Sequence, residues 1–568
     1  MRQKCTVLAG LVAVFVILAH PGTAQDFMID ESLRADRTAV LELQRQLNDL
    51  GMDAGRPDGA FGPRTRAAIE AFAARFPSDV PVGLGAAMQE RIAQVHQGRF
   101  GNPFEQELAR LSLTSPLPNF MGATNVRETV PGCTTCNAIS LILVTGDLTG
   151  DGRDEIVVST HLADPRFNVI DRPSPLVIFS PGQTGPKLNT TLIEPEMPSR
   201  VHEREAVIAD FNSDGQLDLF IAAAGWDAPP FPGEQNVLLL SDAGRLIDVS
   251  DSHLPRLDDM AHGVAAGDIN GNGHVDLLII TNQGTAGHIP YVLLNDGQGR
   301  FERTPIAQFL DPALVDFRPA DRRHRAEFST ARLIDMNGNG ALDLLLLARG
   351  EDAARAGRFP GTRQSLLLFN DGTGRFPTET MIELPTDRWG LATFTNDAAA
   401  VDLDGDGHLD LILTQSTRGP GNGEWFGHYL QVLMFEDGTY VERTAERLWP
   451  QGYPDMPNLS FADKTRLVDL TGNGHPDIVT ATLSPSWRDR PDEAAITIGL
   501  NDGTGHFRPV APTWLTGGHR SYSARQIVPG VFSAEGLPGL AAYDLNGVYG
   551  SGPDQTFGVR LNIYTPGR

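Results

Sequence analysis

Six short segments of the chain combine side-chain oxygens and a glycine in one fixed order, and this order suits the binding of a hard cation. Each segment reads D-x-[DNT]-x-[DN]-G-x-x-[DE]. The six copies begin at Asp147, Asp210, Asp268, Asp335, Asp402 and Asp469. Calcium accepts about six to eight oxygen ligands at flexible angles, so the side chains at positions one, three, five and nine and the carbonyl at position seven can surround it. The sequence predicts up to six calcium sites.

The predicted ligands are the side chains at these four positions of each loop. In chain order they are Asp147, Thr149, Asp151 and Glu155; Asp210, Asn212, Asp214 and Asp218; Asp268, Asn270, Asn272 and Asp276; Asp335, Asn337, Asn339 and Asp343; Asp402, Asp404, Asp406 and Asp410; and Asp469, Thr471, Asn473 and Asp477. The fifth loop has four carboxylates and the third has two, so we expect the fifth to bind calcium most tightly. One copy alone would fit a metal-free turn, but six copies in register favour the metal.

Two other kinds of metal site fit these segments less well. An EF-hand needs a bidentate Glu at position twelve and a following helix, whereas residues 411–414 and 277–280 are apolar or β-branched, as in buried strands. His274, His408 and His475 stand at position seven, where the backbone carbonyl is the ligand, and no HExxH spacing accompanies them. We therefore do not expect these histidines to bind a metal.

The loops recur at a distance that fits one four-stranded sheet per repeat. Their first aspartates lie 63, 58, 67, 67 and 67 residues apart. Segments such as YVLLNDGQGRF from Tyr291 and SLLLFNDGTGRF from Ser365 follow the loops and predict hairpins that turn at Asp-Gly. Residues 119–568, divided into repeats of about 64 residues, predict a mainly β fold, a seven-bladed β-propeller.

The two ends of this region are expected to meet in one blade. Residues 139–145 would begin the first blade, and residues 559–564 would supply a late strand of the seventh. The seventh copy, VFSAEGLPGLAAY near residue 532, has lost most of the acids, so we expect a blade without a metal. Strands from both ends of the region would then close the propeller.

The loops and repeats resemble the FG-GAP/VCBS repeat family, the calcium-loop propeller shared by integrin α-chain heads, some fungal lectins and many secreted bacterial proteins. The resemblance covers residues 119–568 and implies the propeller fold and the calcium ligands. The FG and GAP motifs that name the integrin version are absent from the blade starts. Integrin-style ligand binding is therefore not carried over to this chain.

Upstream of the repeats, residues 36–96 predict a small three-helix all-α domain. Apolar residues recur at spacings of three and four over residues 38–50, which predicts an amphipathic helix that Gly51 can end. Pro63 is placed to open a second helix, and a third is expected over residues 82–95.

The string LELQRQLNDLGMDAGRPDGAFGPRTRAAIEAFAARF closely resembles the peptidoglycan-binding domain family of bacterial wall enzymes. It matches the leucine-rich first helix, the DGxFGPxT turn and a helix ending in AF. The resemblance implies a wall-binding module that docks on glycan or stem peptide without doing chemistry. The matching positions are Asp58, Gly59, Phe61, Gly62 and Thr65. A helical bundle whose site has decayed or serves another partner is the alternative.

Residues 1–24 predict a secretory signal peptide: Arg2 and Lys4 precede an apolar run and a small-residue cleavage site. A retained anchor is the alternative. Cleavage takes the formal charge from −25 to −27, because two cations and no acids are lost. Cys133 and Cys136 then remain, and this pair favours a short-loop disulfide in an exported protein. We expect a chain without a transmembrane segment after cleavage, periplasmic or extracellular and associated with the wall, with a linker over residues 97–118.

The face opposite the calcium loops is expected to hold a ligand. Trp226, Tyr291, Trp425 and Trp487 lie between predicted strands two and three, where their rings can stack on sugars. Arg204 and His262 are expected on inner strands near the axis. The other members of this polar funnel are Glu205, Ser329, Asn396, Asp397 and Asp463. The alternatives are rings that pack between blades and polar residues that merely solvate the axis.

The charge balance excludes some functions, and the motifs favour one. A pI of about 4.9 disfavours nucleic acid and anionic membranes as partners. No GxSxG elbow, HExxH motif or suitable cysteine–histidine pair is present, so no catalytic residue is assigned. We expect a non-enzymatic calcium-binding propeller that binds a glycan or a surface protein and is targeted to peptidoglycan. One alternative is a wall- or polysaccharide-processing lyase or hydrolase, with His262 as base and Arg204 as neutralising cation. The other alternative is a structural surface protein.

Overall fold

The computed structural model describes residues 27–100, 120–130, 137–164, 169–182, 186–196, 198–226, 231–281, 289–315, 327–349, 364–389, 394–418, 425–448, 461–482, 495–510, 524–532, 538–544, 548–549 and 556–566. The predicted signal peptide, Cys133, Cys136 and Trp487 lie outside these residues. The chain divides into two compact units, residues 1–95 and 96–568. In the described part of the chain, no helix is both long enough and apolar enough to span a membrane.

The first unit is helical, as the sequence predicts. Its helices are α1 (Glu31–Ala35), α2 (Arg37–Asp49), α3 (Pro63–Arg75) and α4 (Ala86–Phe100). Two short strands, β1 (Met28–Ile29) and β2 (Gly83–Leu84), pair in parallel. Asp36 caps α2 by accepting N–H bonds from Thr38 and Ala39. The third predicted helix begins four residues late, because β2 occupies the stretch before it.

The core of the helical unit follows the apolar pattern of the sequence. Val40, Leu43 and Leu47 of α2 are buried, and Leu50, which ends this helix, is buried with them. They share the interior of this unit with Ile69 and with other buried residues of α3 and α4. The 3.6-residue periodicity therefore identified the inner faces of these helices correctly.

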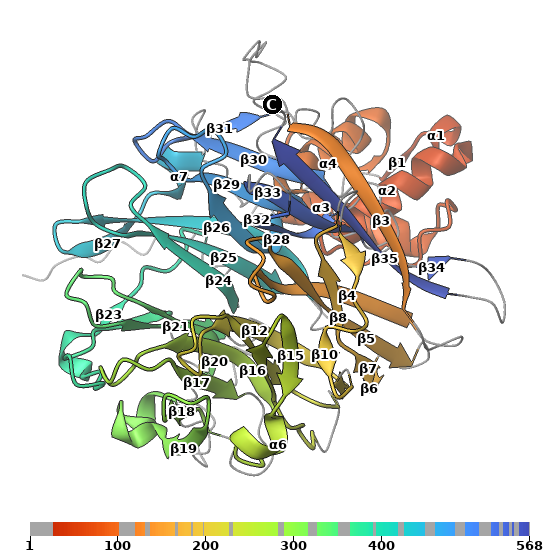
Figure 1. The fold of residues 1–568 in the computed structure, drawn as a ribbon. Helices are drawn as coiled ribbons and strands as arrows, with labels where there is room; N and C mark the ends of the chain where they lie inside the picture. Colours follow the sequence, from red (N-terminus) through yellow and green to blue (C-terminus); the bar gives the residue numbers. More distant parts are fainter. Residues whose placement is uncertain are drawn as a thin grey trace, which may run out of the picture. The chain divides into compact units, whose positions relative to one another are not determined.

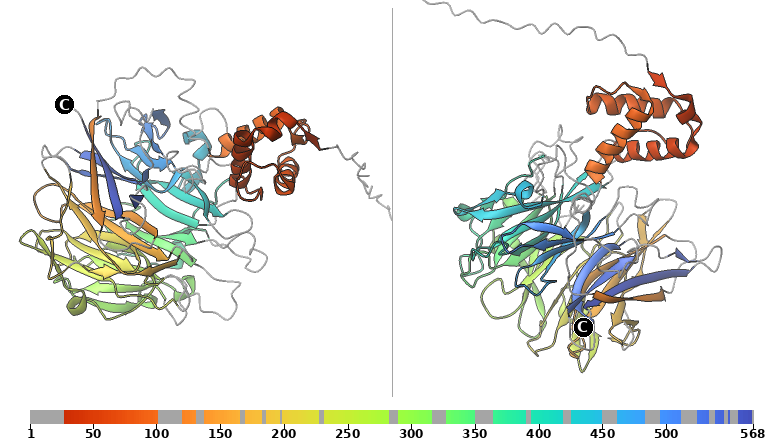
Figure 2. Two further views of the ribbon diagram at one scale, coloured as in Figure 1. Left: turned by 90° about the vertical axis from the view of Figure 1, so that its right-hand side faces the viewer. Right: turned by 90° about the horizontal axis from the view of Figure 1, so that it is seen from above.

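Six sheets make up the propeller in the described residues (Figures 1 and 2). Their strands, in order within each sheet, are β4 (Asn137–Gly146), β5 (Glu155–Asp164), β8 (Val177–Ser180) and β9 (Lys187–Leu188); β12 (Glu203–Ala209), β13 (Asp218–Ala223), β14 (Val237–Asp242), β15 (Arg245–Asp248) and β10 (Ile193–Glu194); β16 (Ala261–Gly267), β17 (Asp276–Thr281), β18 (Tyr291–Asn295) and β19 (Phe301–Pro305); β20 (Glu327–Ile334), β21 (Asp343–Arg349), β22 (Leu366–Leu368) and β23 (Ile382–Glu383) joined to β24 (Phe394–Val401), β25 (Asp410–Arg418), β26 (Trp425–Glu436) and β27 (Thr439–Glu442); β28 (Phe461–Val468), β29 (Asp477–Thr482), β30 (Ala495–Asn501) and β31 (Phe507–Val510); and β32 (Ala524–Val531), β33 (Pro538–Asp544), β35 (Thr556–Pro566) and β3 (Phe120–Val130).

Short additional elements accompany these sheets. They are β6 (Val169–Arg172), which pairs with β5; β7 (Ser174–Pro175), which pairs with β11 (Ser199–Arg200); β34 (Val548–Tyr549), which pairs with β35; and the helices α6 (Ser250–His253) and α7 (Thr444–Leu448). Two of them, β7 and β11, form a separate two-stranded sheet.

Seven separate four-stranded sheets, which the repeat count predicts, are not confirmed. The described residues form six sheets of four or more strands, because β20–β23 and β24–β27 are joined into one sheet of eight strands. A single residue pair, Arg349 with Phe394, makes this junction between β21 and β24.

The propeller core lies between successive sheets. Strands such as β13 and β17 are buried along their whole length, so apolar residues face both neighbouring sheets. One cluster joins Val157 of β5 to Leu219 of β13, and the last joins Ile156 of β5 to Val528 of β32. The continuous apolar runs after each loop are explained by this burial on two sides.

Strands from both ends of the propeller region share the last sheet, but the N-terminal one is β3, whereas the predicted residues 139–145 lie in β4 of the first sheet. β3 pairs with β35 over most of its length, for example Val126 with Leu561. In Figure 1 the orange β3 lies beside the dark blue β35. The first strands of the repeats lie side by side in the order β4, β12, β16, β20, β24, β28 and β32, with β32 next to β4. This closed ring surrounds the axis.

Candidate cation loops and axial site

The six loops share one hydrogen-bond pattern at their first residue. In every loop this aspartate accepts backbone N–H bonds from positions five and six. In the fifth loop, Asp402 Oδ1 accepts from Asp406 at 3.1 Å and Oδ2 accepts from Gly407 at 2.9 Å. Gly407 has a φ of 89°, a left-handed conformation that favours glycine. This geometry explains why position six is glycine in every copy.

The acid at position nine is buried and is also held by two N–H groups. Asp410 Oδ2 accepts from Leu403 at 2.9 Å, and Oδ1 accepts from Phe435 of β26 at 2.8 Å. Burial raises the pKa of Asp410 to about 6, although the two N–H bonds act in the opposite direction. Burial likewise raises the pKa of Asp218, Asp276 and Asp477 to about 6 and that of Glu155 to about 7. A nearby cation would favour the ionised form of these acids.

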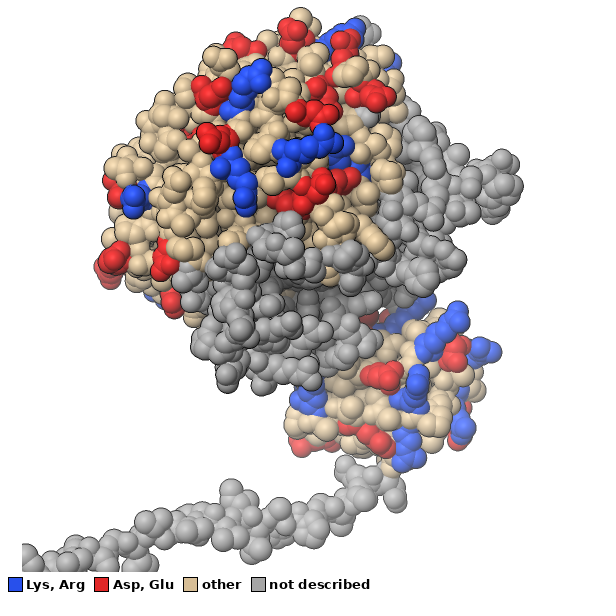
Figure 3. Space-filling view, turned by 90° about the horizontal axis from the view of Figure 1, so that it is seen from below, with Lys and Arg blue, Asp and Glu red and all other residues tan. Residues whose placement is uncertain are grey.

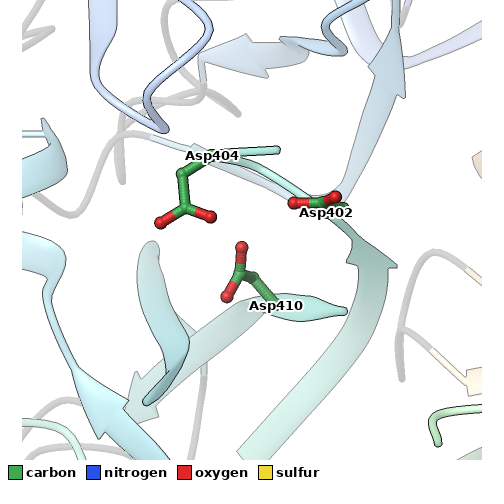
Figure 4. A group of neighbouring side chains, drawn as sticks. All are labelled: Asp402, Asp404 and Asp410. Carbon is green, nitrogen blue, oxygen red and sulfur yellow. The ribbon is translucent and has the colours of Figure 1, made fainter. Parts of the chain in front are cut away.

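Three carboxylates of the fifth loop converge. One oxygen from each of Asp402, Asp404 and Asp410 lies within 4.8 Å of the other two, and Figure 4 shows the three side chains facing one another. Asp404 Oδ1 is buried without a hydrogen-bond partner, while its Oδ2 lies 3.7 Å from Arg447 Nη2 of α7. Buried oxygens without a donor fit a hard cation, so these residues fit the calcium that the sequence predicts.

The histidines at position seven pack against hairpin turns. A side chain at Gly297 would strike the His274 ring, one at Gly503 would strike the His475 ring, and the His408 ring lies 5.1 Å from that of Phe435. That these histidines do not bind a metal stays a prediction, and His274 Nδ1 is buried without a hydrogen-bond partner in the described residues.

At the other end of the first strands, a β-bulge recurs at a fixed position. The register shifts six residues before the loop aspartate, at Arg204, His262, Ser329 and Asn396. A bulge adds a residue to one strand and re-aims its side chain. These four residues all belong to the polar funnel that the sequence predicts.

Five charged side chains from the first strands meet around the axis, and we call them the axial cluster. Asp397 of β24 accepts hydrogen bonds from Arg332 Nη2 of β20 and, at 2.9 Å, from Arg466 Nη1 of β28. Glu205 Oε1 of β12 lies 3.1 Å from Arg332 Nη2 and 3.9 Å from Lys464 Nζ of β28. The axial cluster thus ties together four first strands that lie far apart in the sequence.

The acids of the axial cluster are ionised at neutral pH. Burial acts to raise the pKa of Glu205, but Arg332 and Lys464 outweigh it, and the pKa lies below its ordinary value. Arg332 and Arg466 lower the pKa of Asp397 against burial in the same way. Three cations therefore face two anions. The cations are more exposed, with side-chain exposures of 19 to 25%, against 6 to 10% for the acids.

Beside the axial cluster lies a histidine group made of His161, His202, Arg204 and His262. Arg204 donates from Nη1 to His202 Nε2 and from Nη2 to His262 Nδ1, each at 3.0 Å. The rings of His161 and His202 meet edge to face at 4.5 Å. Burial lowers the pKa of His202 far below its ordinary value, and Arg204 adds to this effect. His202 is therefore neutral and carries its proton on Nδ1, which is buried without a partner.

A buried acid completes this region. Glu203 Oε2 accepts a hydrogen bond from Ser159 at 2.9 Å, and its carbonyl lies 2.8 Å from His161 Nε2. Burial raises the pKa of Glu203 to about 8, so this side chain is a neutral acid at pH 7.

The predicted aromatic residues do not form one surface in the described residues. Trp226 is 40% exposed and available to a ligand. Tyr291 is 2% exposed and lies under the Arg303 guanidinium, 4.7 Å from the ring centroid, so it packs inside its sheet and cannot stack on a sugar. The side chain of Trp425 lies outside the described residues, as does all of Trp487.

In the helical unit, one residue that sequence reasoning missed organises the predicted turn. Gln44 Oε1 accepts N–H bonds from Asp58 at 3.0 Å and Gly59 at 2.9 Å, and Nε2 donates to Ala60 O and Thr65 Oγ1, each at 3.1 Å. Gly59 and Thr65 are buried, so they are fold-determining. Asp58 is exposed and Phe61 and Gly62 are half-buried, which leaves these three to meet a ligand.

Acidic and basic side chains are interspersed on the propeller surface that Figure 3 shows. The acidic surplus of the chain is therefore not gathered into one patch on that face.

Comparisons with known proteins agree with both units. A family model described as FG-GAP-like repeat matches residues 210–279 and 335–413, and one described as a peptidoglycan binding domain matches residues 36–76. The chain thus contains FG-GAP-like repeats, arranged as a propeller, and a peptidoglycan-binding domain. No curated protein matches the chain.

Three solved structures illustrate distant likenesses. The K499G mutant of the NanB sialidase from Streptococcus pneumoniae has 9% identity and a TM-score of 0.34, covering 81% of this chain and 72% of that one. A thermostable family-43 glycoside hydrolase has 11% identity and a TM-score of 0.29, covering 56% and 96%. The Dos1 propeller has 12% identity and a TM-score of 0.34, covering 75% and 95%. Likenesses this distant carry no argument about function.

Proposed function

We propose that this protein is exported and is held at peptidoglycan by its helical unit, where its calcium-stabilised propeller binds a further ligand. The observation that carries the proposal is the turn over residues 58–65, which lies within the stretch that matches the peptidoglycan-binding family and is held from beneath by Gln44. The predicted signal peptide supports export. Calcium loops support it too, because weak sites of about 0.1 to 1 mM suit an extracytoplasmic calcium supply.

Replacing Gln44 with Ala is expected to abolish co-sedimentation of the chain without its signal peptide with purified sacculi. The change removes the donors and acceptors that hold the turn, so its buried N–H groups lose their partners. Gln46→Ala is the matched control, because the Gln46 side chain donates only to Glu42 on the same helix. Equal pelleting of both variants and the unmodified chain would contradict a wall site in the helical unit.

We also propose that the six loops bind calcium through the oxygens predicted from the sequence, and that the fifth binds it most tightly. The convergence of Asp402, Asp404 and Asp410 supports this order. When bound, calcium supplies positive charge that offsets the mutual repulsion of the acids. The chain supplies the loop that orients them through the N–H groups of residues 403 and 405–407.

Asp402→Ala should reduce the measured calcium stoichiometry by one and lower the melting temperature more in calcium than in chelator. The substitution removes both a ligand and the side chain that holds the loop. Calorimetric titration and thermal melts measure these effects. Asp371→Ala, which alters a similar acid in a hairpin turn outside the loops, is expected to leave the stoichiometry unchanged. Unchanged stoichiometry and melting temperature in Asp402→Ala would show that the ranking is wrong.

We infer that the eight-stranded sheet is two blades in contact, which would make seven blades. Each half has its own first strand, cation loop and second strand, and the halves share one residue pair. Both first strands, β20 and β24, take their places in the ring around the axis.

The ligand that we propose for the propeller carries a carboxylate, as the muramic acid of wall glycan does. Lys464 and Arg466 stand two residues apart on β28, so they share one face of the strand. Among the described residues, the ion pair of Lys464 Nζ is the 3.9 Å contact with Glu205, and Arg466 bonds through Nη1. The remaining donors and the surplus positive charge of the axial cluster suit one anionic group.

Lys464→Met is expected to weaken binding of N-acetylmuramate at least tenfold, measured by calorimetry in calcium. N-acetylglucosamine, which lacks the carboxylate, is expected to bind more weakly than N-acetylmuramate to the unmodified chain. The exposed Lys187 on β9 provides the matched control, Lys187→Met. Equal affinity for the two sugars, or an unchanged affinity in Lys464→Met, would contradict a carboxylate site at the axis.

A wall-processing enzyme is the second candidate function, because Arg204 and His262 do meet. Their geometry favours binding over catalysis: Arg204 donates to His262 Nδ1, so the lone pair that a general base would use is already engaged. Release of reducing ends or unsaturated uronides from a glycan panel would support the enzyme, and binding without turnover would support the proposed function.

A further inference from the structure

The asparagine of the hairpin motif Asn-Asp-Gly joins one cation loop to the loop of the preceding repeat. Asn295 Nδ2 donates to Val275 O at position eight of its own loop (3.0 Å) and to Phe211 O at position two of the preceding loop (2.8 Å). Asn370 donates in the same way to Leu342 O (3.1 Å) and Ile269 O (3.2 Å). The motif that predicts a hairpin therefore has a second role.

The next repeats with this motif extend the pattern. Asn501 Nδ2 donates to Leu403 O at position two of the fifth loop, at 3.1 Å. In the second repeat a serine takes the place of the asparagine. The single hydroxyl proton of Ser241 is donated to Leu217 O of its own loop, so Ser241 Oγ, 3.5 Å from Leu148 O, has no proton left for the first loop.

The same residues hold the position-nine acids through their backbone. The N–H of Asn295 donates to Asp276 at 2.9 Å, and that of Asn501 donates to Asp477 at 2.8 Å. In each preceding loop, the residue at position two accepts the hydrogen bond from the asparagine side chain through its carbonyl. The same residue donates its N–H to the position-nine acid of its own loop, as Phe211 does to Asp218 at 2.8 Å. The position-nine acids of neighbouring loops are thus connected through the backbone of one residue, its N–H on one side and its C=O on the other, and through one asparagine.

This connection is interrupted between the fourth and fifth loops in the part of the chain that the structure describes. Phe435 occupies the asparagine position of the fifth repeat and donates its N–H to Asp410 at 2.8 Å, but its ring has no donor for Met336 O. Tyr440 Oη instead donates to Leu409 O of the same loop, at 3.0 Å. Loops two to four are therefore linked in one run and loops five and six in another.

We propose that the loops bind cations as two coupled groups, loops two to four and loops five and six, and that Asn295, Asn370 and Asn501 are the positioning residues that carry the coupling. This inference rests on the proposed cation binding. A bound cation orders the position-nine acid and the peptide at position two of its loop. The neighbouring loop is hydrogen-bonded to that peptide through the asparagine side chain. It therefore loses less conformational freedom when it binds its own cation, which lowers the free energy cost of binding the second cation.

The test uses the full chain without its signal peptide and follows amide hydrogen exchange in each loop during a titration with calcium alone. Asp268→Ala, which disables the third loop, should raise the calcium midpoints of loops two and four at least threefold and leave loops five and six unchanged. Asp469→Ala should raise the midpoint of loop five and leave loops one to four unchanged.

Substitution of the linking residue separates coupling from a general loss of stability. Asn295→Ala should remove the effect of Asp268→Ala on loop two and keep its effect on loop four. Asn295→Ser, whose single proton would go to its own loop as that of Ser241 does, should remove the effect on loop two as well. If no loop gains protection in calcium, the proposed cation binding fails. If the loops respond but both loop variants shift all midpoints equally, or shift none outside the altered loop, the coupling is overturned.

Discussion

Replacing Asp397 with Asn is expected to lower the free energy of unfolding of the propeller by about 3 to 5 kcal/mol, because it leaves two partly buried guanidinium groups without their shared anion. Arg332 and Arg466 both bond to this carboxylate, which is 6% exposed. Glu205 alone would then face three cations. Urea unfolding, monitored by a probe confined to the propeller, measures the loss.

Asp371→Asn provides the control for this prediction. Asp371 is exposed, and its hydrogen bonds are confined to its own hairpin turn, so its substitution is expected to cost about 0.5 kcal/mol or less. A loss below about 1 kcal/mol in Asp397→Asn would show that water replaces the carboxylate at little cost and that the axial cluster is not a buried network.

The sequence predicts which residues lie near the axis, but it does not predict which of their side chains contact one another. Arg204, Glu205, His262, Ser329, Asn396 and Asp397 stand five or six residues before a loop aspartate, so the repeat places them on equivalent parts of the first strands. Their partners Arg332, Lys464 and Arg466 stand three or five residues before a loop aspartate on other strands. Only the closed ring decides which strands face one another, and no local pattern encodes that arrangement.

Two further differences have equally local causes. The predicted count of seven blades differs from the six large sheets because Arg349 pairs with Phe394, a contact that β21 reaches by extending past its pairing with β22. Gln44 was missed because a glutamine on an amphipathic helix usually faces solvent, whereas this one is buried beneath the turn over residues 58–65. The cation loops, in contrast, repeat six times, and repetition made their positions and glycines predictable.

Gly263→Ala is expected to destabilise the propeller by about 3 kcal/mol, because β16 and β20 approach too closely for a Cβ atom at this position. The added atom would lie 2.6 Å from Thr330 Oγ1 and 2.8 Å from Thr330 Cα, so backbone must move. Thr330 Oγ1 donates to Glu205 Oε2 at 2.7 Å across Gly263. The strain therefore reaches the axial cluster and exceeds the gain of about 0.4 to 1 kcal/mol from a less flexible unfolded chain.

Gly267→Ala on the same strand separates this clash from a general effect of alanine. A Cβ atom at Gly267 would meet Leu342 Cδ1, the end of a side chain that can rotate away, so we expect a change of about 1 kcal/mol or less. Urea unfolding of the two variants compares them directly. If they lose equal stability, the close approach of β16 and β20 is not what requires glycine. If Gly263→Ala alone is destabilised and N-acetylmuramate binding weakens with it, the packing of these two strands also sets the geometry of the axial site.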